Sequence, residues 1–381
     1  MKNIFPTYQQ YPIDIIDGHD WHLTDRKGNE YLDFTSGIGV CNFGYSNEMI
    51  INNVKIQLDR IWHTSNLYES ALVDEVAGAL CAPEMLAFFC NSGTEANEAA
   101  LKLARKATGK PTVLAFNNSF HGRTYGAMSL TGNPGIKVGF APLVPEIKFA
   151  NYNDPSALKQ INKRIGAVIL EVIQGEGGVV DGQAEWLQQV QAACHKAGAL
   201  LIIDEVQTGM GRTGEKFAYQ NFGLDPDIVT VAKGIANGLP LGAMLSKKQL
   251  ASAFGPGSHG TTFGGNKLAL AAAKGVLAQL TPDFLADVRK KSSSVWEFLS
   301  KEIQPLTIVQ GISGKGLMIG IHLSEVLDVK QVIAHLQGKG ILTLSANYNT
   351  LRLLPPLVMS SKDLLAGMMK IKTVLTILGR K

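Results

Sequence analysis

The chain has 381 residues, of which 45% are hydrophobic and 18% are charged, and its formal net charge at pH 7 is +4. This length exceeds what a single hydrophobic core usually organises, so we expect two domains, or one domain with a smaller appendage. The composition excludes a disordered or fibrous chain. No dense run of lysine and arginine occurs, so neither nucleic-acid binding nor membrane-surface binding is indicated.

The cysteines and the hydropathy pattern bear on the cellular compartment. Cys41, Cys81, Cys90 and Cys194 form no C-x-x-C pair and no ligand spacing with histidines, which is typical of reduced cysteines that pack as small apolar residues. The first residues lack the apolar region of a signal peptide, and no stretch approaches the roughly 18 apolar residues of a membrane helix. We therefore expect a soluble, cytoplasmic protein without a bound metal.

Residues 21–34 are predicted to form a hairpin, in which a polar turn at 25–29 joins two strand-like runs. From about residue 70, helices and strands alternate. The predicted strands are short, aliphatic or β-branched, and largely unalternating, and they lie at 112–116, 167–173, 199–203, 228–232 and 242–246. Such strands are buried on both faces, so we expect an α/β fold with a mostly parallel sheet covered by helices.

Helical periodicity marks the segments between and after these strands. Alanines and leucines recur every three or four residues at 94–107, and a second helix is expected from Gln183 to Lys196. A long helical region, roughly 266–303, is followed by strand-like pieces near 306–322 and 341–354 and by helices near 325–337 and 361–378. We therefore expect three parts: an N-terminal segment with the hairpin (1–45) that belongs to the small domain, a large domain (46–270) and a C-terminal small α+β domain (271–381).

Lys233 and Asp204 each end a strand-like run, at 227–232 and 199–203. A lysine can form a Schiff base with the aldehyde of pyridoxal phosphate, and an aspartate can keep the pyridine nitrogen protonated so that the ring acts as an electron sink. Open α/β sheets bind their ligands at the carboxyl ends of the strands. The two residues therefore indicate a pyridoxal-phosphate enzyme, although most lysines are solvated surface charges.

The predicted helix start at residues 91–97 is a candidate phosphate site. Ser92 and Glu95 match a capping box, which sets the start of the helix. The exposed N–H groups there, the hydroxyls of Ser92 and Thr94, and Gly93 would together make a cradle for a phosphate. An ordinary well-capped helix has the same pattern, so this signal is weak in isolation.

Residues 209–214 match G-x-G-x-x-G, which marks dinucleotide sites when it joins a strand to a helix. Here residues 204–208 separate the motif from its strand, and residues 215–217 do not begin a convincing helix. No second strand ends in an acidic residue about 20 positions further on. We therefore interpret the segment as a flexible glycine-rich loop and not as the nucleotide site of a dehydrogenase.

Two arginines are candidate ligands for carboxylates. Phe120, His121 and Arg123 follow the predicted strand at 112–116, where a ring could stack on a flat cofactor and the guanidinium could bind a carboxylate in a fork. Arg352 lies among apolar neighbours, and a buried arginine must find an anion. Glu176 is an available partner, so this pair is either structural or part of a substrate site.

Together these segments resemble the class III aminotransferases of the ornithine and acetylornithine type, a subgroup of the fold-type-I pyridoxal-phosphate enzymes. The resemblance covers nearly the whole chain, through the segments at 31–34, 91–97, 120–124, 171–178, 204–209, 230–238, 259–266 and 351–356. One departure is Val172-Ile173, where many relatives have a proline after the glutamate. The resemblance implies a fold-type-I transferase whose large domain binds pyridoxal 5'-phosphate and whose reaction is a ping-pong amino transfer.

By position, the resemblance assigns roles in a cofactor site. Lys233 would form the Schiff base and carry the proton between the substrate carbon and the cofactor carbon, because burial and a cationic ring lower the pKa of a lysine. Asp204 would be the partner of the pyridinium nitrogen, and Gln207 would contact the ring hydroxyl oxygen. The residues that would hold the phosphate or flank the ring are Ser92, Gly93, Thr94, Phe120, His121 and, from a second subunit, Thr262.

The same resemblance implies a substrate site and a partner. Arg123 would clamp the substrate carboxylate, and Glu176 and Arg352 would form a switch pair that is closed with a diamine-type donor and open for glutamate. The family implies a homodimer with shared active sites, which Thr262 and the segment 66–68 would help to complete.

The preferred donor is inferred from one further position. Ornithine-specific relatives carry a tyrosine at the position of Ile38 to hold the free α-amino group, and isoleucine can neither donate nor accept a hydrogen bond. The resemblance therefore favours transfer from N2-acetyl-L-ornithine to 2-oxoglutarate, which gives N-acetyl-L-glutamate 5-semialdehyde and L-glutamate in arginine biosynthesis. Succinylornithine, ornithine, 4-aminobutyrate and a lysine-pathway semialdehyde are alternative substrates, and an aminomutase, which would need no external oxo acid, is the alternative reaction.

Overall fold

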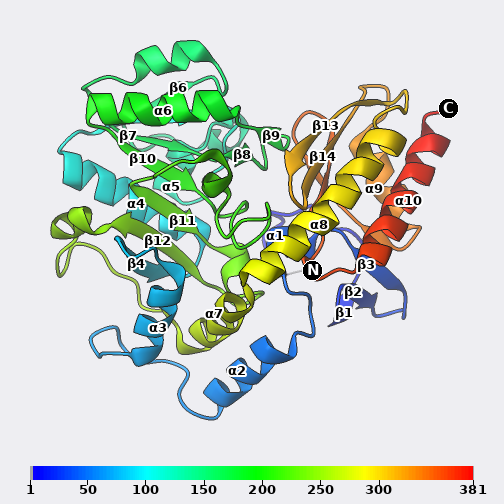
Figure 1. Ribbon diagram of the computed structural model, residues 1–381, viewed down its shortest axis with the longest axis horizontal. Coiled ribbons are helices and arrows are strands. Elements are labelled where there is room, and N and C mark those ends of the chain that lie inside the picture. The colour runs from blue at the N-terminus through cyan, green and yellow to red at the C-terminus, as the bar shows by residue number, and fades with distance from the viewer. Residues whose placement is uncertain (1–2, 381) are drawn as a thin grey trace.

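Seven strands form the central sheet of the computed structural model, which describes residues 3–380 (Figure 1). The strand order is β4-β12-β11-β10-β7-β5-β6. The strands are β4 (Met85–Cys90), β5 (Thr112–Phe116), β6 (Ile147–Ala150), β7 (Ile165–Leu170), β10 (Leu200–Asp204), β11 (Ile228–Val231) and β12 (Gly242–Lys247). β12 runs antiparallel to both neighbours, and every other pair in the sheet is parallel. The prediction of a mostly parallel sheet is confirmed.

Helices cover both faces of this sheet. α4 (Gly93–Thr108) packs its alanine-rich face on one side, against residues that include Val113 and Ile202. α6 (Ala184–Ala197) packs on the other side, through Trp186 and Val190. Further helices of the large unit are α2 (Glu48–Leu58), α3 (Ala71–Leu80), α5 (Tyr125–Leu130) and α7 (Lys267–Gln279). Because apolar residues cover both faces of each central strand, the strands read as continuous apolar runs.

A smaller antiparallel sheet lies beside the large unit, on the right in Figure 1. Its order is β13-β14-β17-β16, formed by β13 (Val309–Lys315), β14 (Met318–Leu323), β16 (Leu344–Ala346) and β17 (Thr350–Leu353). Three helices accompany it: α8 (Pro282–Phe298), α9 (Val329–Gln337) and α10 (Ser361–Leu378). The apolar residues of the helices and of this sheet form one core cluster.

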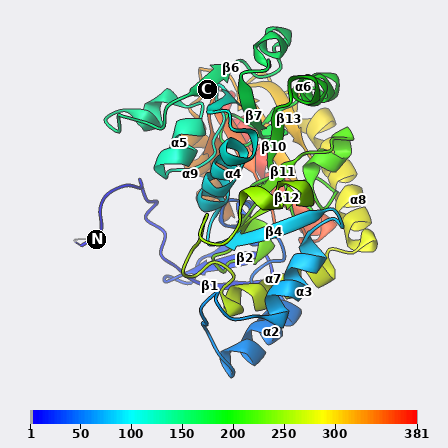
Figure 2. The ribbon, with the colours of Figure 1, turned by 90° about the vertical axis from the view of Figure 1, so that its left-hand side faces the viewer.

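The N-terminal strands join this smaller unit. The predicted hairpin is present as β2 (His22–Asp25) and β3 (Glu30–Asp33), preceded by the unpredicted β1 (Ile15–His19). β3 pairs in parallel with β15 (Ile341–Leu342), so the two ends of the chain share a sheet. Residues 3–14 extend away from the body of the molecule (Figure 2) and expose Phe5 and Tyr8.

The long helical region expected at roughly 266–303 consists of two helices, α7 and α8, followed by a π-helical turn at Leu299–Ile303. Thr281 accepts a hydrogen bond from the Phe284 N–H and caps α8, whose first residue is Pro282. Proline has no N–H to donate and is favoured at this first position, so the first helix ends before it.

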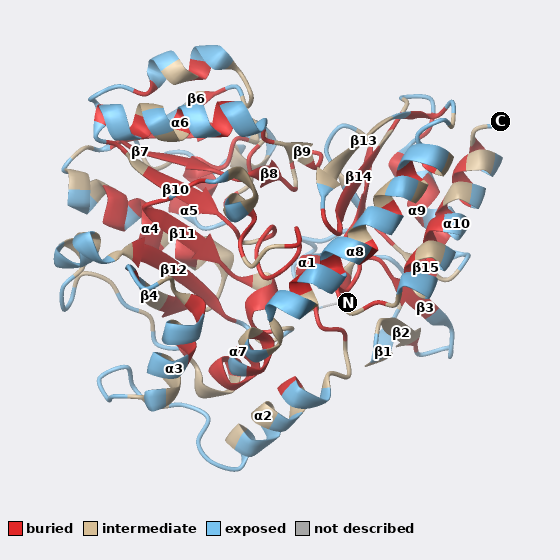
Figure 3. Ribbon diagram, in the orientation of Figure 1, coloured by how far each residue is buried: buried red, intermediate tan, exposed pale blue. Residues whose placement is uncertain are grey.

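Short elements complete the structure: α1 (Ser36–Gly39), β8 (Ile173–Gln174), β9 (Val180–Asp181) and the 3-10 turns Pro134–Lys137, Pro155–Gln160, Ala218–Phe222, Lys233–Ile235 and Lys248–Ala253. Buried residues concentrate in the central sheet and in the facing sides of the helices (Figure 3). All four cysteines are free thiols. Within residues 3–380, no helix has both the length and the apolar character required to cross a membrane.

Candidate active site

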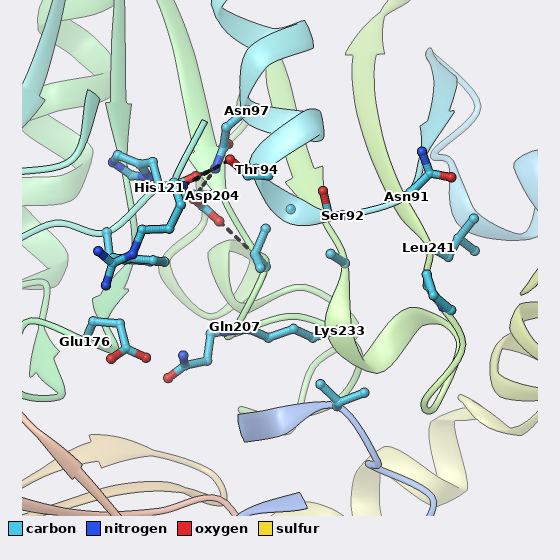
Figure 4. A pocket seen from close by; sticks show the side chains of 18 of the residues that line it. Asn91, Ser92, Thr94, Asn97, His121, Glu176, Asp204, Gln207, Lys233 and Leu241 are labelled. Carbon is cyan, nitrogen blue, oxygen red and sulfur yellow. Dashed lines mark hydrogen bonds and ion pairs between the residues drawn. The ribbon is translucent and has the colours of Figure 1, made fainter. Parts of the chain in front are cut away.

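A cavity of about 430 Å³ opens at the carboxyl ends of the parallel strands (Figure 4). Most of the residues that the sequence singled out line it: Ser92, Gly93, Thr94, Phe120, His121, Arg123, Glu176, Asp204, Gln207 and Lys233. The segments that follow β5, β7, β10 and β11 supply several of them, which is where open α/β sheets bind their ligands.

Asp204 is the last residue of β10 and is buried on the floor of this cavity. Its Oδ2 accepts hydrogen bonds from Asn97 Nδ2 and His121 Nδ1, each at 2.8 Å, and its Oδ1 accepts the Val206 N–H at 3.0 Å. Asn97 is held in turn by the Thr230 hydroxyl, which donates to Asn97 Oδ1. These contacts fix the carboxylate in one orientation, so that it can pair with a cationic ligand atom.

Lys233 follows β11 and has a left-handed backbone conformation, with φ of 48°. Such a conformation is uncommon for residues other than glycine and is found at functional sites when the surrounding structure holds it. Burial lowers the pKa of the Lys233 amine, although the charges of Glu176, Asp204 and Glu171 oppose that shift. The neutral amine is the form that acts as a nucleophile or a base.

The N-terminus of α4 faces the same cavity. Ser92 caps the helix and accepts the Glu95 N–H, as predicted. The first N–H groups of a helix have no partner within it, so those of Gly93 and Thr94 can bind an anion. The hydroxyl of Thr94 is engaged elsewhere, because it accepts the N–H groups of Arg123 and Thr124. The contribution of the Thr94 hydroxyl to a phosphate cradle stays a prediction.

Arg123 is exposed on the loop that follows Phe120, and its guanidinium carbon lies 5.6 Å from the centre of the Phe120 ring. No carboxylate among residues 3–380 forms an ion pair with it. A guanidinium at the rim of a cavity with its donors free is suited to a ligand carboxylate.

Glu176 and Arg352 form the ion pair that the sequence suggested, although 176 positions separate them. Arg352 Nη1 donates to Glu176 Oε1 at 2.6 Å and to Gln207 Oε1 at 3.2 Å. The Arg352 side chain is 3% exposed and that of Glu176 is 36% exposed. Burial would raise the pKa of Glu176, but the adjacent Arg352 outweighs it, so that the net pKa is lowered. The carboxylate therefore stays ionised near neutral pH.

Three residues that we associated with the site do not line the cavity of this chain, namely Ile38, Thr262 and Arg352, and Arg352 reaches the lining only through Glu176 and Gln207. Ile38 lies in the left-handed turn α1, with φ of 69°, and is 42% exposed, while Val40 is the residue of this segment that lines the cavity. Thr262 is exposed on a separate loop. Asn66 donates to the carbonyls of Thr261 and Gly264, so the segment 66–68 and this loop lie side by side.

Glu171 and Asn97 are site residues whose roles the sequence did not suggest. Glu171 follows β7 and accepts the N–H groups of Phe120 and Gly175, at 3.0 and 3.3 Å. Burial raises the pKa of Glu171 to about 7. Each residue carried a signal: Glu171 is a carboxylate directly after a buried strand, and Asn97 is a polar residue on the apolar face of a helix.

The glycine-rich segment 209–214 is packed and not flexible, contrary to expectation. Its residues are buried, and Arg212 has no exposed surface. Arg212 donates hydrogen bonds to the carbonyls of Leu317 and Pro355, to Ser36 Oγ and to Asn42 Oδ1. The arginine thus joins the N-terminal segment, the large unit and the smaller unit, which the spacing of glycines alone could not reveal.

The chemistry of this cavity fits pyridoxal phosphate. It offers the Lys233 amine, whose pKa is lowered by burial, a buried carboxylate at Asp204 and the anion-binding end of α4. Within the described residues, the buried Nε2 of His121 has no hydrogen-bond partner, which leaves one polar atom of the lining for a ligand. The volume lies in the range of sites for small cofactors.

Comparison with known proteins agrees with this interpretation. Residues 5–375 match the family described as aminotransferase class III. A relative named acetylornithine aminotransferase, from Lactiplantibacillus plantarum, is 63% identical over 379 residues, which cover 99% of this chain and 97% of the relative. A solved ornithine aminotransferase from Toxoplasma gondii superposes with a TM-score of 0.94 at 27% identity, covering 100% and 94% of the two chains. A solved N-acetylornithine aminotransferase from Stenotrophomonas maltophilia gives 0.83 at 30% identity, covering 97% of each chain.

Proposed function

The chain belongs to the class III aminotransferases, which use pyridoxal phosphate, and from this premise we propose that it transfers the terminal amino group of N2-acetyl-L-ornithine to 2-oxoglutarate. The products are N-acetyl-L-glutamate 5-semialdehyde and L-glutamate, and the step belongs to arginine biosynthesis in the cytoplasm. The observation that carries the reaction class is a lysine amine of lowered pKa in one cavity with a fixed carboxylate and with an arginine that forms no ion pair among the described residues. The choice of donor is supported by the 63% identity to an acetylornithine aminotransferase.

The proposed roles follow from the contacts of each side chain. When bound, pyridoxal phosphate supplies an electron sink that stabilises negative charge on the substrate carbon. Asp204 would hold the ring nitrogen in its protonated form, because Asn97 and His121 orient its carboxylate. The N–H groups of Gly93 and Thr94, with Ser92, would hold the phosphate.

Lys233 would move the proton. Burial lowers the pKa of the Lys233 amine and so favours its neutral form, in which Lys233 Nζ can accept a proton from the substrate carbon and return it to another carbon. Phe120 would flank the ring. Gln207 presents its carbonyl oxygen to Arg352, which leaves its amide N–H groups to donate to the ring hydroxyl oxygen.

Two arginines would distinguish the two amino donors of the cycle. Arg123 would bind the carboxylate that acetylornithine and glutamate share. Arg352 would bind the second carboxylate of glutamate, for which it must leave Glu176. With acetylornithine the pair stays closed, as it is in this structure, so Glu176 and Arg352 would act as a switch between the two half-reactions.

We propose that a homodimer completes the site. Leu67, Tyr68 and Phe263 expose 91%, 73% and 58% of their surface, and their segments lie side by side through the hydrogen bonds of Asn66. Large apolar side chains exposed together mark an interaction surface. Across the dimer, Thr262 and the segment 66–68 would reach the cavity of the partner, where the Thr262 hydroxyl would help to hold the phosphate.

The donor is tested by the absorbance of the cofactor-loaded protein on mixing with one amino donor and no oxo acid. N2-acetylornithine, ornithine and 4-aminobutyrate are compared at equal concentrations, and acetylornithine should change the visible spectrum fastest. The TM-score of 0.94 to an ornithine aminotransferase makes free ornithine the second candidate, since the fold does not separate the two donors. A clear advantage of ornithine would refute the acyl-donor proposal and leave the aminotransferase class intact.

The role of Lys233 is tested by Lys233→Ala, which should abolish turnover because no other side chain can replace its amine. The control is Lys196→Ala, an exposed lysine at the end of α6. Retention of even one hundredth of wild-type activity by Lys233→Ala would contradict the assignment.

A further inference from the structure

Glu98 accepts three hydrogen bonds from the loop that carries Arg123. Its Oε1 lies 2.6 Å from the Thr124 hydroxyl, 2.8 Å from the Gly126 N–H and 3.2 Å from the Ala127 N–H. Thr124 is the residue that precedes α5, yet its own side chain does not cap that helix. The two N–H groups that an N-cap side chain usually satisfies are taken by Glu98, which belongs to α4. A carboxylate is also favoured at this end of a helix.

The hydroxyls of Thr94 and Thr124 form a chain of hydrogen bonds in which each proton is donated toward Glu98. A carboxylate only accepts, so the Thr124 proton points to Glu98. The 2.8 Å contact between Thr94 Oγ1 and Thr124 Oγ1 must then use the Thr94 proton. Thr94 Oγ1 in turn accepts the N–H groups of Arg123 and Thr124 at 3.2 and 3.3 Å. The charge of Glu98 therefore orients a hydroxyl chain that ends on the backbone of Arg123.

The two glycines that bracket Arg123 allow this close approach. A Cβ at Gly122 would lie 2.2 Å from Thr94 Oγ1, and one at Gly126 would lie 2.1 Å from Glu98 Oε2. Gly122 also has φ of 140°, which disfavours a side chain. The loop is thus seated on α4 at both ends, while the Arg123 side chain between them is exposed and free of ion pairs within residues 3–380.

We propose that Glu98 is a positioning residue for the substrate carboxylate: it seats the loop 122–127 on α4 and so sets the place of the Arg123 guanidinium. The inference rests on the proposed function, in which Arg123 binds the carboxylate of the amino donor. Glu98 itself does not line the cavity and acts through Thr124 and Thr94. Its removal therefore weakens the binding of donors that carry a carboxylate at the end remote from the reacting amine and leaves donors without that carboxylate unaffected.

The experiment compares two donors that differ only in this carboxylate. They are N2-acetylornithine and N-acetyl-1,4-diaminobutane, which is the same molecule without its carboxylate. In the holoenzyme, Glu98→Ala should raise the KM for N2-acetylornithine by about 10- to 100-fold, the loss expected from a misplacement of about 1 Å, with a smaller change in kcat. For the decarboxylated donor, kcat/KM should stay within about twofold of wild type. Glu185→Ala, at an exposed glutamate of α6, is the matched control.

A double-mutant cycle separates positioning from a general structural effect. If Glu98 acts through Arg123, Glu98→Ala has no further effect on either donor in an Arg123→Ala background. Two results would overturn the inference. One is an equal fall in kcat/KM for both donors in Glu98→Ala, and the other is that Glu98→Ala raises the KM for N2-acetylornithine in the Arg123→Ala background as much as it does alone. If Glu98→Ala does not fold, as judged by thermal unfolding, Thr124→Val removes only the hydroxyl link and must show the same selective rise in KM. Its failure to do so also overturns the inference.

Failure of the proposed function gives a different result. Arg123→Ala should remove the preference for the donor with the carboxylate. If that preference survives in Arg123→Ala, Arg123 is not the carboxylate ligand and the proposed role of Arg123 is wrong. If Arg123→Ala loses the preference and Glu98→Ala keeps wild-type KM values for both donors, only the inference about Glu98 fails.

Discussion

Glu176→Gln tests whether the ion pair with Arg352 controls the choice between amino donors. The substitution keeps the shape of the side chain and removes the charge that holds Arg352. In the proposed reaction, glutamate needs Arg352 for its second carboxylate, and acetylornithine does not. The variant should therefore bind glutamate more tightly than the wild type, while the affinity for acetylornithine should not increase.

The size of the effect follows from the exposure of the two partners. Loss of one partner from a fully buried pair costs about 3–5 kcal/mol, and an exposed pair contributes about 0.2–1 kcal/mol. Arg352 is 3% exposed and Glu176 is 36% exposed, and their contact is 2.6 Å long. The free energy that this pair contributes should therefore lie between the values for buried and exposed pairs. Discounting for the solvent around Glu176, we expect about 1–2 kcal/mol, which corresponds to a Kd for glutamate lowered by about 5- to 30-fold.

The assay is a single half-reaction, followed by the absorbance of the bound cofactor after rapid mixing with either donor and no oxo acid. The dependence of the rate on concentration gives an apparent Kd for each donor. Glu185→Gln serves as the control for a neutralised surface charge. An unchanged Kd for glutamate, or an equal change for both donors, would refute the role of Glu176 as the group that competes with the substrate.

Three further predictions concern stability. Arg212→Met should lower the free energy of unfolding by about 3–5 kcal/mol in urea, because it leaves the buried acceptors of the Arg212 guanidinium without a donor, and a loss below about 1 kcal/mol would contradict this. Burial raises the pKa of Glu205 from 4.5 to about 7, so its contribution to stability is complete below pH 4.5 and is lost as the pH rises through 7. The difference in the free energy of unfolding between wild type and Glu205→Gln, measured in urea, should shrink over that interval. Ile38→Asn should raise the melting temperature and add up to about 1 kcal/mol, because asparagine tolerates the left-handed conformation that strains a β-branched residue.

Periodicity predicted the elements whose signal is local. Helix α10 runs from Ser361 to Leu378, as its spacing of apolar residues indicated, and Ser360 caps it. The strands β5, β10 and β11 were found because residues buried on both faces make continuous apolar runs. The break at Thr281-Pro282 was missed although a cap residue followed by proline is itself a helix-start signal.

The features that the sequence did not predict depend on how distant segments are arranged in the fold. The residues of β12 do not show that it is antiparallel to both neighbouring strands, because the direction of a strand depends on how the chain returns to the sheet. The short strand β6 lies at the sheet edge and buries too few residues to give a pattern. Most of the candidate site residues were identified from strand ends, loops and family motifs. The contacts of Glu98 and Arg212 were not, because each acts on segments that meet it only in the fold.

Helix α4 bears on the proposed site at three points within its first two turns. Its N-terminal N–H groups line the cavity where we propose that the phosphate binds, Asn97 donates a hydrogen bond to Asp204, and Glu98 accepts hydrogen bonds from the loop of Arg123. A helix rises by about 1.5 Å per residue and is stiff, so these three points keep a constant spacing. In the proposed reaction, the amine of the donor must reach Lys233 while its carboxylate stays at Arg123, and the helix fixes the distance between these two positions. The main chain of one helix would thereby select the length of the donor. Mutations that enlarge the cavity by shortening a side chain of its wall should therefore not readily admit a longer donor.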